Sequence, residues 1–152
     1  MGEYYLRVIK MGFIYAIIAG SAMSIQGVMN TRLGEKAGLF EANTFVQGTA
    51  FVISLIIMLI WGQGSIKEIA SAKPYTWFGG VIGVIITVTV MLSQKTLSPQ
   101  LSVSSILIAQ LIVAALIDTF AIMDTPKQPF GLMKIIGTAL MIVGVVLIKL
   151  KK

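Results

Sequence analysis

Apolar residues fall into five long stretches along this chain, separated by short segments that contain proline, glycine or charged residues. Each stretch is close to the roughly 20 residues that a helix needs to cross a bilayer. We therefore predict five membrane-spanning helices, over residues 11–28, 42–61, 75–92, 101–123 and 130–148. Little chain remains between them, so the expected fold class is all-α, with residues 1–152 forming a single membrane domain.

The connecting segments carry helix-breaking residues, which supports these boundaries. Residues 62–65 read Gly-Gln-Gly-Ser, Pro74 precedes the third stretch and Pro99 precedes the fourth. Proline and glycine mark chain breaks because they cannot, or need not, continue a helix. The longest predicted connector, residues 31–41, holds four charged residues. We expect it to form a short amphipathic turn at the membrane surface.

The first stretch has some features of a signal peptide. Arg7 and Lys10 precede it, and residues 19–21 (Ala-Gly-Ser) make a weak cleavage site. The apolar run continues past that site to Val28, which favours an uncleaved span. An alternative start at Met11 stays open, in which case the first ten residues are an extension.

The composition agrees with an integral membrane protein. Apolar residues make up 57% of the chain, charged residues only 12%, and the mean hydropathy is +0.92. A soluble domain is about a quarter charged. The chain has no Cys and no His, which removes disulfides, thiolate nucleophiles and the usual general base. We expect a multi-pass protein of the plasma or inner membrane that is not an enzyme and uses no metal or cofactor.

Basic residues flank the apolar stretches, as membrane anchors do, and form no basic face for nucleic acid. With five spans the two termini lie on opposite sides of the membrane. The N-terminal side carries six basic residues: Arg7, Lys10, Lys67, Lys73, Lys127 and Lys134. The opposite side also carries six: Arg32, Lys36, Lys95, Lys149, Lys151 and Lys152.

Because the two sides carry equal numbers of basic residues, the positive-inside rule predicts no preferred orientation. One interpretation is a small bias hidden by the assumed loop boundaries. The other is dual topology, in which the chain inserts both ways and pairs as an antiparallel homodimer. An odd number of spans favours the second interpretation, because two oppositely inserted copies supply the inverted repeat that many transporters need. A heterodimer with a related chain stays possible.

Asp118 is the one carboxylate well inside a predicted span. A charge there is costly unless it faces water or a partner, so such residues are candidate functional sites. We predict that Asp118 binds a cationic group of a small-molecule substrate, or a proton. The alternative is structural: Asp118 lies five residues before the end of its span, where a carboxylate can hydrogen-bond between helices.

Several polar side chains accompany it inside or at the ends of the spans. The candidates for substrate binding are Gln26, Asn30, Gln110 and, more weakly, Thr87. Gln26 and Asn30 are four residues apart and share a helix face. Asn43 and Gln47 repeat that spacing, and for them we favour hydrogen bonds between helices. For Gln26, Asn30 and Gln110, both roles stay open.

Arg32 and Asp118 lie toward opposite sides of the membrane in one chain. In an antiparallel dimer, Arg32 of one copy shares a leaflet with Asp118 of the other. Arg32 then either positions Asp118 or holds a lipid headgroup. Small residues predict close helix packing, and the candidates are Gly79, Gly80, Gly83, Gly137 and Gly144.

Five short motifs resemble those of the YdcZ-like proteins of the drug/metabolite transporter superfamily. Residues 26–34 are similar to Q-x-x-x-N-x-R-L-G, residues 45–49 to F-x-x-G-T, and residues 74–83 to P-x-x-W-x-G-G-x-x-G. Gln110 and Asp118 resemble a G-Q…D pattern, with Ala109 in the place of the usual glycine. Gly137 and Gly144-Val145 complete the series.

The resemblance implies one half of a ten-helix transporter fold, whose first, third and fourth helices line a cavity and whose fifth packs at a dimer interface. The related four-helix multidrug resistance proteins use a glutamate in the first helix, and residues 11–28 contain no carboxylate. The expected function is alternating-access transport of a small molecule. The alternatives are a lipid-linked substrate flippase subunit, a non-transporting membrane scaffold, or one half of a heterodimeric transporter.

Overall fold

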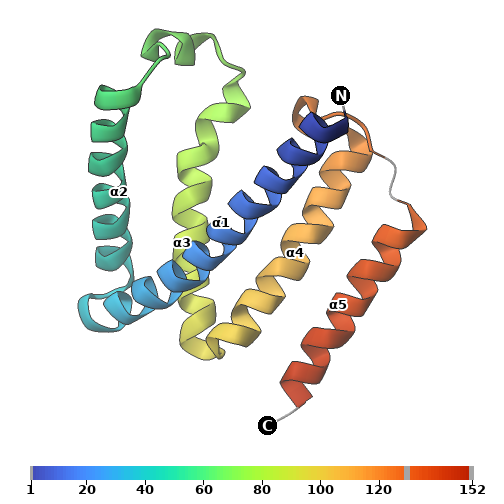
Figure 1. Ribbon diagram of the computed structural model, residues 1–152. Helices are drawn as coiled ribbons and strands as arrows, with labels where there is room; N and C mark the ends of the chain where they lie inside the picture. Colours follow the sequence, from blue (N-terminus) through green and yellow to red (C-terminus); the bar gives the residue numbers. More distant parts are fainter. Residues whose placement is uncertain (1, 129–130, 151–152) are drawn as a thin grey trace. The chain divides into compact units, whose positions relative to one another are not determined.

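A computed structural model describes residues 2–128 and 131–150 of the chain. Its long helices are α1 (Gly2–Ala37), α2 (Leu39–Trp61), α3 (Gly79–Thr96), α4 (Pro99–Phe120) and α5 (Leu132–Leu150) (Figure 1). Short 3-10 helices are η1 (Ile66–Ser71), η2 (Pro74–Phe78) and η3 (Ile122–Asp124). All five long helices are long and apolar enough to cross a membrane. The predicted fold class and number of spans are confirmed.

The predicted connector over residues 31–41 is wrong. Helix α1 continues to Ala37 and α2 begins at Leu39, so a single residue, Gly38, joins them. Three of the four charged residues instead lie in the last turns of α1, and Glu41 lies in the first turn of α2. Arg32 and Glu35 make an ion pair of 2.9 Å at a spacing of three residues, which supports a helix. Gly38 has a φ of 102°, and a Cβ there would collide with the carboxylate of Glu41.

Helix α4 ends at Phe120, three residues earlier than predicted. Ala121, Met123 and Asp124 have φ values of 52°, 58° and 61°, which end the helix. The chain then folds back, and the backbone N–H of Gln128 donates to the carbonyl oxygen of Asp118 over 2.9 Å. This bond satisfies one of the carbonyls that a helix end leaves unpaired. The predicted start of the last span, at residue 130, and the terminal lysines 151 and 152 lie outside the described residues.

The chain divides into two compact units. The first extends to Thr96, and in it α1, α2 and α3 contact one another. The second begins at Leu97, and in it α4 packs against α5. The single membrane domain stays a prediction.

Figure 1 shows the end of the first unit at which α1 turns into α2. The buried side chains of this unit gather there. Ala42 and Met91 are the buried apolar residues there. At the opposite end, η1 and η2 connect α2 to α3, and the indole N–H of Trp77 donates to the carbonyl oxygen of Ile69 over 2.9 Å. The described residues at that end are exposed. The three helices are therefore packed tightly at one end only.

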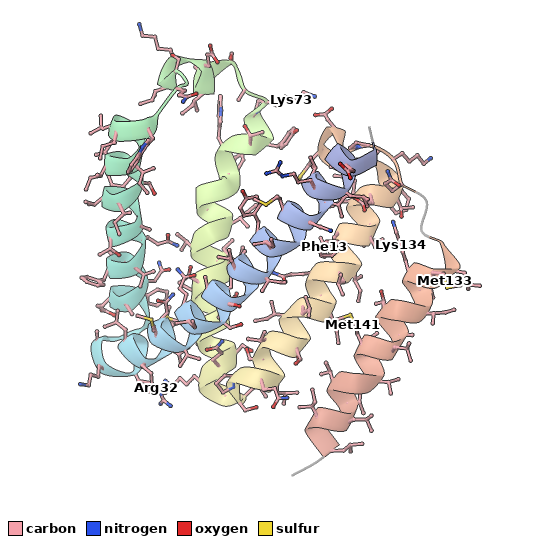
Figure 2. The ribbon with its side chains drawn as sticks, viewed as in Figure 1. Phe13, Arg32, Lys73, Met133, Lys134 and Met141 are labelled. Carbon is pink, nitrogen blue, oxygen red and sulfur yellow. The ribbon has the colours of Figure 1, made fainter. Side chains whose placement is uncertain are left out.

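Large apolar side chains cover the outside of every long helix, and Phe13 on α1 is one of them (Figure 2). Soluble monomers rarely expose apolar surface on this scale. The exposed residues extend over the length of the helices, as expected where acyl chains surround the protein.

Candidate functional site

A polar cluster lies between α1 and α3, and its centre is Gln94. The hydroxyl of Thr31 donates to the carbonyl oxygen of Gly27 over 2.8 Å and lies 3.5 Å from Oε1 of Gln94. A Cβ added at Gly27 would lie only 2.6 Å from Nε2 of Gln94. The missing side chain of Gly27 is therefore what lets the Gln94 amide lie against the backbone of α1.

Two polar atoms of this region are buried without a hydrogen-bond partner among the described residues. They are Nε2 of Gln94 and Oδ1 of Asn43, on side chains that are only 8% and 7% exposed. An unsatisfied buried donor or acceptor costs about 1–3 kcal/mol. Asn30 is also buried. Buried amides with unused hydrogen-bonding capacity are uncommon, which makes this cluster a candidate polar site.

A second polar contact joins α2 to α3 in the middle of the first unit. Nε2 of Gln47 donates to the hydroxyl oxygen of Thr87 over 3.3 Å, and Thr87 in turn donates to the carbonyl oxygen of Gly83 over 2.9 Å. Gln47 therefore makes a hydrogen bond between helices, as expected. The same contact occupies Thr87, the weakest of the predicted substrate-binding residues.

The other predicted residues differ in exposure. On α1, Asn30 is buried and Gln26 is exposed, although they are four residues apart. On α4, Gln110 is exposed. Arg32 is 75% exposed and is directed outward at the end of α1 (Figure 2), where Glu35 is its ion-pair partner. Their roles in substrate binding stay predictions.

In the second unit, Asp118 lines a groove of about 370 Å³ between α4 and α5. The side chain of Asp118 is half-buried. Lys134, near the start of α5, lines the same groove. The sequence does not predict that Lys134 faces Asp118, because basic residues near the end of a span are typical of membrane-flanking anchors. Its spacing of three, four and seven residues from Gly137, Thr138 and Met141 is the signal that places it on their face.

The glycines predicted to pack helices together have open space around them. A Cβ added at any of the following would meet no atom within 4 Å: Gly79, Gly80, Gly83, Gly137 and Gly144. Any close packing at these positions would involve groups outside the described chain, so that role stays a prediction. A tight contact between two long helices instead occurs at Gly27, which in the sequence is recognisable only as part of a motif.

The fold and these sites define a multi-pass α-helical membrane protein with polar and charged side chains placed between its helices. A family model described as "Putative inner membrane exporter, YdcZ" matches residues 11–147. The chain belongs to this YdcZ family of the drug/metabolite transporter type, which confirms the resemblance seen in its motifs. The description and the five helices agree with a multi-pass inner-membrane location. No match was found among curated proteins or among solved structures.

Proposed function

We propose that this chain exports a small molecule across the inner membrane as one half of an antiparallel, dual-topology homodimer. The observation that carries the proposal is the six-to-six division of basic residues between the two sides of five spans. Opposite insertion of two copies makes the inward-open and outward-open states equivalent, as the inverted repeats of many transporters do. Membership of an exporter family supports the direction of transport.

Asp118 is the proposed site for a cationic substrate group or for a coupling proton. Its half-buried carboxylate lines a groove and makes no side-chain hydrogen bond or ion pair among the described residues. A carboxylate in that position gains most from a ligand that carries positive charge. Gln26, Asn30 and Gln110 are proposed to supply hydrogen bonds to the substrate, and Thr87 is proposed to join them only where it gives up its contact with Gln47.

Arg32 is proposed to lie near Asp118 of the oppositely inserted copy. Its ion pair with Glu35 does not oppose this, because exposed pairs contribute only about 0–1 kcal/mol. In the dimer Arg32 can leave Glu35 at little cost and pair with Asp118 of the second copy whenever no substrate occupies that carboxylate. Each leaflet then contains one such pair.

Disulfide cross-linking tests this arrangement without knowledge of the substrate. Two differently tagged chains, one with Arg32→Cys and one with Asp118→Cys, are co-expressed and oxidised in the membrane. The native chain has no Cys, so each variant carries a single thiol. We expect a cross-linked dimer that contains both tags.

The matched control pairs Arg32→Cys with Lys95→Cys. Both positions lie on the same side of one chain and so in opposite leaflets of an antiparallel dimer. Cross-linking of the control pair, with none between Arg32→Cys and Asp118→Cys, would show a parallel arrangement and contradict the proposal.

A second candidate is a flippase subunit for lipid-linked substrates. A second groove between α4 and α5, of about 450 Å³, is lined almost wholly by apolar side chains such as Ile112, Leu116 and Ile142. Such a lining suits an acyl chain. This candidate requires a different partner subunit, so stable co-purification of a second membrane protein with the tagged chain would favour it over the homodimer.

A further inference from the structure

The groove that contains Asp118 is built from one face of each helix of the second unit. On α4 the lining residues are Leu111, Ala114, Ala115 and Asp118, and on α5 they are Lys134, Gly137, Thr138 and Met141. Both sets follow the spacing of three, four and seven residues that defines a single helix face. Because Asp118 lies near the end of α4 and Lys134 near the start of α5, the two charges lie at the same end of the groove.

Lys134 and Met141 are directed from α5 toward α4, whereas Met133 points away (Figure 2). Asp118 and Lys134 nevertheless form no ion pair with each other, and neither side chain makes a hydrogen bond within the described ranges. Within one chain, both charges are therefore available to a ligand. The groove presents one carboxylate and one ammonium group above an apolar floor.

The rest of the groove limits the size of the ligand. Ala114, Ala115 and Gly137 leave space between the helices, and a Cβ added at Gly137 would meet no atom within 4 Å. Leu111 and Met141 line the end away from the charges. A volume of about 370 Å³ lies within the range of small-molecule sites. It suits a compact apolar body with its charged groups at one end.

The geometry points to a zwitterion as the ligand of this groove, with its ammonium group on Asp118, its acidic group on Lys134 and its apolar body between Ala114 and Gly137. A simple cation would bring its charge close to Lys134, and a simple anion would bring its charge close to Asp118. A zwitterion pairs both and adds no net charge, which lowers the cost of placing it within the membrane. This inference rests on the proposed transport function and names its substrate class.

Three probes that share one apolar body test the inference. They are L-leucine, which is zwitterionic, leucinamide, which is cationic, and 4-methylpentanoate, which is anionic. The full chain is purified in an uncharged maltoside detergent, and binding of labelled leucine is measured by equilibrium dialysis with the other two as competitors. A charge-assisted hydrogen bond contributes enough for roughly tenfold or more in affinity. We expect leucine to bind at least that much more tightly than either analogue.

Single substitutions then separate the two charges. Asp118→Asn should remove the preference for leucine over 4-methylpentanoate, and Lys134→Gln should remove the preference for leucine over leucinamide. The double variant with Asp118→Lys and Lys134→Asp should recover leucine binding, which also shows that a loss in the single variants is not misfolding. Matched controls are Glu68→Gln and Lys149→Gln, which remove the same charges outside the groove.

Leucinamide binding as tightly as leucine, with no effect of Lys134→Gln, would overturn the zwitterion and leave a cation site. The absence of binding by all three probes would also overturn it. Phosphatidylethanolamine added to the micelles tests a lipid headgroup with the same charges. If it alone binds with the expected dependence on the variants, a lipid replaces the small molecule. None of these results alters the Arg32–Asp118 cross-link, so the proposed dimer stands or fails separately.

Discussion

At the scale of single residues, the contact between Gly27 and Gln94 shows how a missing side chain permits a polar contact. The Gln94 amide fills the place that a Cβ at Gly27 would need. Thr31 lies beside it and accounts for the only hydrogen-bond contact of the Gln94 side chain among the described residues, at 3.5 Å. Small residues of this kind let helix backbones approach each other within a membrane.

Replacing Gly27 should therefore destabilise the first unit. We expect Gly27→Leu to cost about 1–3 kcal/mol, because an added side chain must displace both the Gln94 amide and Val90. Thermal unfolding in detergent measures the change. Gly20→Leu is the control on the same helix, since a Cβ at Gly20 has open space. Equal loss of stability in both variants would mean that the contact with Gln94 is not what matters.

Sequence reasoning located only part of the candidate sites. Asp118 stood out because it is an isolated carboxylate in an apolar run. Gln94 and Lys134 did not, because each lies near the end of a predicted span, where polar residues are common. Their significance depends on what a neighbouring helix places opposite them, Gly27 for Gln94 and Asp118 for Lys134. Hydropathy along a single chain carries no information about such pairing.

At the scale of helices, the connection between α1 and α2 differs most from the sequence prediction. Charge density suggested a surface turn, but the residues involved are good helix formers, and an ion pair between Arg32 and Glu35 supports them. The break is confined to Gly38, which has a positive φ. In contrast, the five spans were predictable, because about 20 apolar residues in sequence have few alternatives to a membrane helix.

Gly38→Ala tests the importance of this one-residue connection. A φ of 102° is unfavourable for a residue with a Cβ, and a Cβ would collide with Glu41. We expect a loss of about 1–3 kcal/mol in unfolding free energy, measured by chemical denaturation in detergent. The control is Gly48→Ala in the middle of α2, where an added Cβ would meet no atom within 4 Å. This substitution should leave the unfolding free energy unchanged or raise it slightly. A neutral Gly38→Ala would show that the turn is conformationally tolerant.

At the scale of the whole molecule, the proposed transport mechanism depends on how the chain inserts in the membrane. The basic residues offer no preferred orientation, and five spans cannot contain an inverted repeat within one chain. Antiparallel pairing of two copies resolves both observations. It also places Arg32 and Asp118, which lie toward opposite sides in one chain, in the same leaflet.

Labelling of a single cysteine tests this claim most directly. Gly64→Cys places a thiol in the exposed segment between α2 and η1, where a side chain has open space, in a chain without other cysteines. Spheroplasts are treated with a membrane-impermeant maleimide before and after lysis. Dual topology predicts that about half of the protein is labelled from outside and the rest only after lysis. Labelling that is complete or absent before lysis would show one fixed orientation and contradict the antiparallel homodimer.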